Sequence, residues 1–241
     1  MTLLIAIDDT DNTESIGTGR LSRMLAEELT KQGMIRQTSV TRHQLLVHPD
    51  IPYTSHNSSA CIEGMLTNGD LQKIVDCARA FLLQNFHEGA DPGLCAAEKE
   101  AVPDTLRMFG MRAQKEVITM EEARDLADQL GVYLWLGGGT GQGFIGAMAG
   151  VGLRSTGNDG RFIDLSGIRE IEGVVSVGTI LSQTAINQVA TMSGETLADH
   201  ELVDTQNWIR PSLHNGHAVL FVQQEGILWR SPKKKKTKNK D

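Results

Sequence analysis

The stretch Thr2–Asp11, TLLIAIDDTD, decides the fold because it joins an apolar segment to a cluster of acids. Residues 2–7 are apolar or β-branched without alternation, which predicts a fully buried strand. Asp8, Asp9 and Asp11 follow at once, and neighbouring carboxylates repel one another unless a cation neutralises them. Mg²⁺ suits such clusters because it keeps several waters and bridges to substrate phosphates. We therefore predict that these aspartates bind magnesium at the carboxyl end of the strand, where open α/β sheets place their ligands.

A second cluster, Gly17-Thr18-Gly19-Arg20, opens a helix whose apolar side chains begin at Leu21. Glycines let the backbone approach an anion, and the N–H groups and dipole of a helix N-terminus attract phosphate. Arg20 can add a charge-assisted contact and stabilise the charge of a transferring group. Thr18 alternatively serves as the N-cap of the helix, a role compatible with phosphate binding. We expect metal and phosphate to meet here, although a solvated, capping Asp-rich turn remains the alternative for the acids.

A glycine-rich segment, Gly137–Gly143, precedes an apolar helix. It lacks the Gly-Lys-Ser/Thr of the P-loop and the strand context of a dinucleotide-binding GxGxxG pattern. Its backbone N–H groups are nevertheless suited to cradling phosphate. The residues predicted to do so are Gly139, Thr140, Gly141 and Gly143. Close helix packing through Gly146 and Gly150 is the alternative, and we expect both roles in different parts of the run.

A proline-braced segment, His48–Ser59, is rich in hydroxyl and histidine side chains, as binding loops often are. Three of its residues are predicted to contact the substrate: Tyr53, His56 and Asn57. The histidines of this region are interpreted as surface residues rather than metal ligands: His43, His48 and His56.

Cysteine spacing, hydropathy and charge exclude several classes of protein. Cys61, Cys77 and Cys95 form no CxxC pair, which argues against a zinc ribbon, and we interpret them as buried apolar residues. No apolar run reaches membrane-spanning length and no basic leader is present, so we expect a cytoplasmic protein without a membrane partner. The tail Ser231–Asp241 holds six lysines and one aspartate; removing its +5 from the overall −7 leaves −12 on the first 230 residues. The acidic body is a poor surface for nucleic acid. The tail is interpreted either as a tether for RNA or an acidic partner, or as a segment that only aids solubility.

Local patterns predict the remaining elements. Strands are expected over residues 38–47, 60–66, 173–181 and 218–223. Helices are expected from Leu21 to Gly33, after Asp70, and from the capping box of Thr119 and Glu122 to Gly131. The pattern breaks up between residues 87 and 103. This mixture predicts an α/β (α+β) chain with domains over residues 1–160 and 161–230 and a disordered tail over 231–241.

The segment Ile5–Asp11, IAIDDTD, has the form of a fairly specific opening, GIDDTDS, found in one family of tRNA-modifying enzymes. Further blocks are individually weak and count mainly by their order: His48–Tyr53, Asp91–Gly93, Gly141–Ala147 and Asn207–Pro211. In these motifs the chain resembles the archaeal tRNA-isoleucine 2-agmatinylcytidine synthetase (TiaS) family over most of residues 3–225.

This resemblance implies a kinase-like domain followed by a ferredoxin-like domain. It implies that ATP and Mg²⁺ activate the C2 carbonyl of a tRNA cytidine by phosphorylation, after which agmatine displaces the phosphate. Asp8, Asp9 and Asp11 would hold magnesium, and Thr18 would correspond to the family's self-phosphorylated threonine. The family continues into an OB-fold and a zinc ribbon, so we expect a short form without them. Thr54 and His56 stand where the family usually carries lysine and arginine, which puts tRNA recognition in doubt.

Two functional hypotheses follow. The first is an ATP- and magnesium-dependent ligase or phosphotransferase of the TiaS type, whose acceptor is a tRNA cytidine, presented with help from a partner chain, or a small molecule. The second is a non-catalytic nucleotide-sensing or RNA-binding subunit that keeps the fold without turnover. A third interpretation treats residues 8–11 as a capping turn and the family likeness as one of fold alone.

Overall fold

The computed structural model describes residues 1–11, 16–51, 57–68, 70–87, 89–206 and 208–232. The chain forms two compact units, Met1–Asp164 and Leu165–Asp241, and each is described by itself. Within the described residues, no helix is long and apolar enough to cross a membrane.

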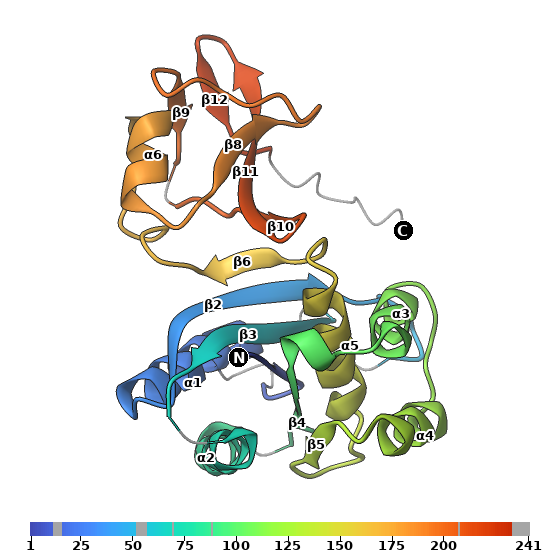
Figure 1. The fold of residues 1–241 in the computed structure, drawn as a ribbon. Helices are drawn as coiled ribbons and strands as arrows, with labels where there is room; N and C mark the ends of the chain where they lie inside the picture. The colour runs from blue at the N-terminus through green and yellow to red at the C-terminus, as the bar shows by residue number, and fades with distance from the viewer. Residues whose placement is uncertain (12–15, 52–56, 69, 88, 207, 233–241) are drawn as a thin grey trace. The chain divides into compact units, whose positions relative to one another are not determined.

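The first unit is built on a mixed α/β fold whose sheet has the strand order β5-β4-β1-β3-β2-β6 (Figure 1). All five pairings along this order are antiparallel. The strands are β1 (Thr2–Asp8), β2 (Ile35–Gln44), β3 (Ser58–Leu66), β4 (Gly93–Glu98), β5 (Tyr133–Leu136) and β6 (Arg161–Asp164). The rule that parallel α/β sheets bind ligands at strand carboxyl ends therefore does not apply, because the end of β1 lies beside the start of β4.

Two apolar cores lie on the two faces of this sheet. Leu4 and Ala6 of β1 face the core shared with α3 (Asp104–Ala113), α4 (Met120–Leu130) and α5 (Gly143–Ser155). Leu3, Ile5 and Ile7 face the core shared with α1 (Thr18–Lys31) and α2 (Leu71–Asn85). Because side chains alternate along a strand, Asp8 falls on the same face as Leu4 and Ala6. A short 3₁₀ helix, Lys99–Ala101, follows β4.

Most local predictions for this unit are confirmed. The strand from Thr2 forms as β1, fully buried between its ends. Asp70 caps α2 by accepting from Lys73 N at 2.9 Å, and Thr119 caps α4 by accepting from Glu122 N at 3.2 Å. The apolar helix after the glycine run forms as α5. Residues 87–103 show no regular hydrophobic pattern in the sequence, but they contain strand β4, which pairs with both β1 and β5.

The second unit contains six strands and one helix among its described residues. Its strand order is β10-β11-β12-β9-β7, with β8 parallel to β11. The strands are β7 (Val174–Ser176), β8 (Gln188–Thr191), β9 (Leu202–Asp204), β10 (Ser212–His214), β11 (His217–Glu225) and β12 (Leu228–Arg230). The predicted strand 173–181 is wrong in its second half, which forms helix α6 (Val177–Gln183). Ser176 starts this helix because its hydroxyl accepts from Thr179 N at 3.1 Å.

Candidate functional site

Asp8 ends β1 with its side chain against helix α5. A Cβ atom at Gly146 would lie 1.6 Å from Oδ2 of Asp8, so only glycine leaves room for this carboxylate. Burial raises the pKa of Asp8 to about 7, and the charges of Asp9 and Asp11 add to the rise, although a hydrogen bond from the Asp9 backbone opposes it. Below about pH 7 this carboxyl is neutral unless a cation favours its charged form.

Asp9 continues the acid cluster in a left-handed backbone conformation, with φ of 51°. Such a conformation is uncommon outside glycine and is found preferentially for Asn and Asp. A Cβ at Gly143 would lie 3.1 Å from the Cβ of Asp9, so the start of α5 packs on this residue too. Burial raises the pKa of Asp9 to about 6, and repulsion by Asp91 and Asp11 contributes further. Asp8 and Asp9 thus form a pair of partly buried carboxylates with raised pKa values.

Asp11 lies at the beginning of α1 rather than against α5. The Thr18 hydroxyl donates to Oδ1 of Asp11 at 2.9 Å and accepts from the Thr10 hydroxyl at 3.0 Å. Thr18 is the first residue of α1 and not its N-cap. The N-cap is Gly17, which has no side chain to accept a hydrogen bond from the helix. The prediction that Thr18 caps α1 is wrong, because its hydroxyl is used by the acid cluster instead.

The first turn of α1 carries no acidic side chain. Gly17 is exposed, Gly19 is partly buried beside Ile163, and Arg20 is exposed. Within the described part of the chain, the Arg20 side chain makes no hydrogen bond or ion pair, so its guanidinium does not contact the aspartates. The helix terminus retains the polarity that favours an anion.

The backbone amides of the glycine loop bind the side chain of Asp91, which was not predicted from the sequence to belong to the site. Oδ2 of Asp91 accepts hydrogen bonds from Thr140 N at 2.9 Å and Gln142 N at 3.0 Å, and Oδ1 accepts from Gly141 N at 2.7 Å. Gly139 also lies against this carboxylate, since a Cβ there would be 2.9 Å from Asp91 Cγ. Of the four residues predicted to cradle phosphate, Thr140 and Gly141 therefore donate their amides to Asp91. The turn at Asp91 is visible in the sequence, but nothing local links it to a loop 49 residues away.

Packing through Gly146 and Gly150 is confirmed. A Cβ at Gly150 would lie 3.0 Å from the Cβ of Ala6 and 2.4 Å from the Ser59 hydroxyl oxygen. Three glycines on one face of α5 thus let the helix approach the sheet directly above Asp8: Gly143, Gly146 and Gly150.

The predicted substrate loop is only partly described. Tyr53 and His56 lie outside the described residues. Asn57 supports the chain: its Nδ2 donates to Leu46 O at 2.6 Å, and its backbone oxygen accepts from Leu45 N at 2.9 Å.

The surface assignment of His43 is wrong. Its side chain is fully buried, with Nδ1 2.7 Å from Oδ1 of Asp159 and Nε2 2.8 Å from the Thr41 hydroxyl. This arrangement suits a neutral imidazole that donates from Nδ1 and accepts at Nε2. Cys61 and Cys95 are buried as expected, and burial raises the pKa of each thiol, whereas Cys77 is only partly buried and the expectation of burial is wrong for it.

The acid cluster could hold a metal ion only if water or a bound substrate supplied further ligands. Within the described residues, no group of three or more His, Cys, Asp and Glu side chains is arranged to hold a metal ion. Mg²⁺, however, commonly uses one or two carboxylates and completes its shell with waters and substrate phosphates. Burial is the main cause of the raised pKa values of Asp8 and Asp9, and repulsion from neighbouring carboxylates, which a divalent cation would relieve, adds to it. The donor set therefore fits magnesium carried by a nucleotide.

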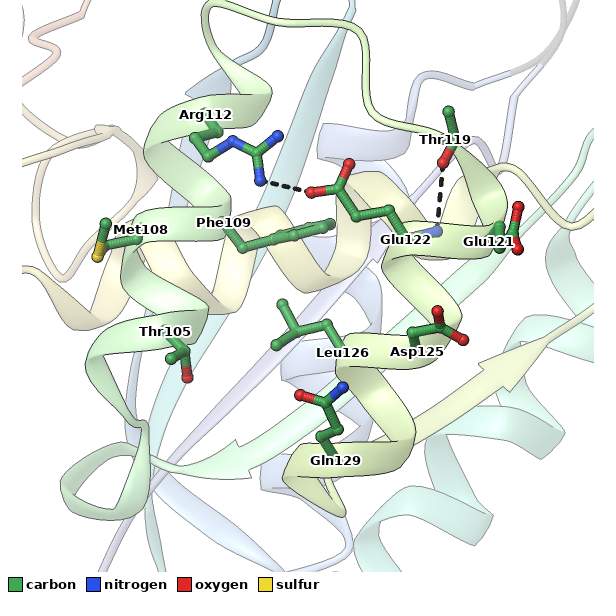
Figure 2. A pocket seen from close by; sticks show the side chains of 10 residues that line it. All are labelled: Thr105, Met108, Phe109, Arg112, Thr119, Glu121, Glu122, Asp125, Leu126 and Gln129. Carbon is green, nitrogen blue, oxygen red and sulfur yellow. Dashed lines mark hydrogen bonds and ion pairs between the residues drawn. The ribbon is translucent and has the colours of Figure 1, made fainter.

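A separate cavity of about 550 Å³ lies between α3 and α4 (Figure 2). Phe109 and Leu126 point toward one another across it, and Arg112 of α3 pairs with Glu122 of α4. None of its lining residues belongs to the acid cluster, α1 or the glycine loop. The cavity is thus distinct from the candidate site.

Comparison with known proteins finds sequences related to this chain. No family model matches it. The tRNA 2-agmatinylcytidine synthetase TiaS of Pyrococcus horikoshii is 32% identical over 163 residues, covering 63% of this chain and 36% of the relative. TiaS of Methanocorpusculum labreanum is 29% identical over 154 residues, covering 62% and 34%. The chain is related to TiaS. It spans about a third of the length of these curated relatives.

Solved structures share part of this fold. A tRNA fluorescent labeling enzyme aligns with a TM-score of 0.54 and 25% identity, covering 63% of this chain and 36% of that one. The complex of TiaS with its isoleucine tRNA and ATP aligns with a TM-score of 0.54 and 24% identity over the same shares of the two chains. At that identity the second likeness supports the fold alone. The mixed α/β architecture is therefore shared with TiaS.

Proposed function

We propose that the chain is an ATP- and magnesium-dependent phosphotransferase or ligase that resembles the catalytic part of TiaS and acts in the cytoplasm on a tRNA cytidine or a related acceptor. The observation that carries this proposal is the Asp8–Asp9 pair, partly buried against α5 with raised pKa values and linked to the N-terminus of α1 through the hydrogen bond of Asp11 with Thr18. In the same proposal, residues 1–164 correspond to the kinase-like domain and the second unit to the ferredoxin-like domain.

Each residue has a role in the proposed reaction. When bound, magnesium neutralises phosphate charge during transfer. Asp8 and Asp9 would hold it, and Asp11 would orient the Thr18 hydroxyl, which is the phosphoacceptor that the resemblance implies. The N-terminus of α1, from Gly17 to Gly19, would bind phosphate oxygens. The exposed guanidinium of Arg20 would contact the transferring phosphoryl group.

The names of the relatives support the choice of substrates. One solved TiaS structure is a complex with its isoleucine tRNA and ATP, and another is a complex with the same tRNA, AMPCPP and agmatine. We propose ATP for this chain on that basis together with the acid pair. An RNA acceptor is proposed less directly, because the net charge of the whole chain is −7 and RNA binding favours basic surfaces.

Asp8→Asn tests the proposal because it keeps the size of the side chain and removes its charge. ATP consumption is measured with and without Mg²⁺, and with and without bulk tRNA. We expect magnesium-dependent turnover in the wild type and a loss of about 100-fold or more in the variant, as for removal of a charge-stabilising group. Asp128→Asn, at an exposed position on α4, is the matched control and should retain activity.

The outcomes separate the two functional classes. Tight magnesium-assisted ATP binding without turnover under any condition would favour the non-catalytic nucleotide-sensing or RNA-binding subunit. Absence of any magnesium-assisted ATP uptake by calorimetry would reject both and leave only the shared fold.

A further inference from the structure

The glycine loop before α5 closes around the carboxylate of Asp91. Three consecutive backbone N–H groups, from Thr140 to Gln142, converge on its two oxygens, and the Thr140 hydroxyl donates to it as well. Consecutive amides that converge on one point form an anion-binding nest. In this chain the anion is already supplied by the protein.

Asp91 is fixed on its backbone side as well. Its N–H donates to the oxygen of Asp9 at 3.1 Å, the oxygen of Pro92 accepts from Gly137 N at 2.8 Å, and Gly93 pairs with Asp8 in the sheet. A Cβ at Gly143 would lie 2.1 Å from the oxygen of Asp91, so the start of α5 leaves no space for this segment to move toward the helix. Contacts on both sides of Asp91 along the chain therefore hold its carboxylate in the nest.

This arrangement joins the loop to the acid pair. The same residue that binds the loop amides donates its backbone N–H to Asp9, and α5 packs on Asp8 through Gly146 and on Asp9 through Gly143. A phosphate entering the nest would have to displace a carboxylate that makes four hydrogen bonds, and charge-assisted bonds are about twice as strong as neutral ones. The first turn of α1 carries no acidic side chain, and among the described residues the nearby Asp11 carboxylate accepts from the Thr18 hydroxyl and not from the backbone amides of the helix.

We propose that Asp91 is a positioning residue that locks the Gly139–Gln142 loop and the Asp9 backbone together, so that nucleotide phosphates bind at the N-terminus of α1 and not in the glycine loop. The part of this inference that concerns phosphates rests on the proposed function; the part that concerns the lock does not.

The lock is tested on the full chain without nucleotide. Asp91→Asn keeps one acceptor oxygen but places an amide NH₂ where the other oxygen accepts. We expect hydrogen exchange of the Thr140, Gly141 and Gln142 amides to accelerate about tenfold or more, the factor that corresponds to ~1.4 kcal/mol. Asp128→Asn should leave these rates unchanged. Unchanged rates in a folded Asp91→Asn protein would overturn the lock.

The phosphate position is tested by NMR on the wild type, which needs no variant to fold. On titration with Mg-ATP, the amide signals of Thr18 and Gly19 should shift, and those of Thr140 to Gln142 should stay in place. Shifts of equal size in the glycine loop would overturn the inference. If no amide shifts, the proposed function fails, the phosphate position fails with it, and the lock is judged by hydrogen exchange alone.

Kinetics distinguish positioning from a general structural role. If Asp91 only orients Asp9 and the loop, Asp91→Asn should lower kcat about tenfold while the Kd for Mg-ATP stays within about threefold. Tighter ATP binding by this variant would mean that Asp91 competes with phosphate for the nest, and would contradict the proposal.

Discussion

Asp8 is the residue at which folding and the proposed function oppose each other. Its carboxylate is partly buried against α5, where the uncharged form is favoured, and the proposed function needs the charged form. A folded-state pKa of about 7, against 3.8 for the free group, means that the folded protein binds this proton more tightly than the unfolded chain. Protonated Asp8 therefore makes its full contribution to the free energy of unfolding below about pH 4. This contribution is lost as the pH rises through about 7.

Asp8→Asn should therefore stabilise the protein at about pH 8 in the absence of divalent cations. The gain should be on the order of a few kcal/mol, because each pKa unit corresponds to ~1.4 kcal/mol, and it should vanish near pH 4. Urea unfolding at the two pH values, with a chelator present, measures it. A variant less stable than the wild type at the higher pH would contradict the assignment, and added Mg²⁺ should narrow the difference by stabilising the wild type.

Helix α5 is the element that positions both acids. Its glycines bring the backbone against β1, and the segment is buried on nearly every side. The sequence predicts this helix and its close packing, because glycine spacing and apolar composition are local signals. The pairing of Asp8 with Gly146 depends on the register between sheet and helix, which no local pattern contains.

Gly146→Ala should disturb the acid pair directly. Its methyl group would displace Asp8 Oδ2, so we expect a destabilisation of about 1–3 kcal/mol, as for overpacked cores, and weaker binding of Mg-ATP. Gly178→Ala in α6 is the control, since its nearest neighbours lie 3.4 Å away in ordinary contact. That change should be neutral or stabilise by up to ~1 kcal/mol through helix propensity. Thermal unfolding and calorimetry measure the two effects.

Strand β2 carries the buried His43, whose partner Asp159 precedes β6. Asp159 also accepts from the side chain of Gln114 at 2.9 Å, so one carboxylate connects β2, the end of α3 and the approach to β6. His43→Leu should cost about 2–4 kcal/mol in urea unfolding, because Thr41 and Asp159 lose their partner in a buried site. His87→Leu, at an exposed position, should change the free energy of unfolding by no more than about 0.5 kcal/mol.

Elements with strong local patterns are predictable, and elements that depend on distant pairing are not. Strand β1 and the capped helix α4 follow from composition and from Thr119. Strand β4, GLCAAE, carries a glycine and two alanines and is a strand only because β1 and β5 flank it. The burial of His43 escapes prediction because its partner lies 116 residues away. Of the candidate site, the acids are found from sequence, whereas Asp91 requires the folded loop.

At the scale of the whole molecule, both cores that surround the acid pair lie within residues 1–164. Each described residue proposed for the nucleotide site, from Asp8 to Arg20, belongs to the first unit.

A fragment of residues 1–164 should fold cooperatively and bind Mg-ATP with a Kd within about threefold of the full chain. Its size is ordinary for an independent domain. Urea unfolding followed by circular dichroism, and calorimetry with Mg-ATP, measure these properties. Folding without ATP binding would show that the second unit contributes to the nucleotide site.

The alternation of β1 between its two cores restricts which changes of length the chain can tolerate. A single residue inserted or deleted within Thr2–Asp8 would shift side chains to the opposite face, sending Ile7 toward Gly146 and the carboxylate of Asp8 into the apolar layer beneath α1 and α2. Homologues that keep the acids should therefore vary in spacing after Asp11, never between the first strand residue and Asp8.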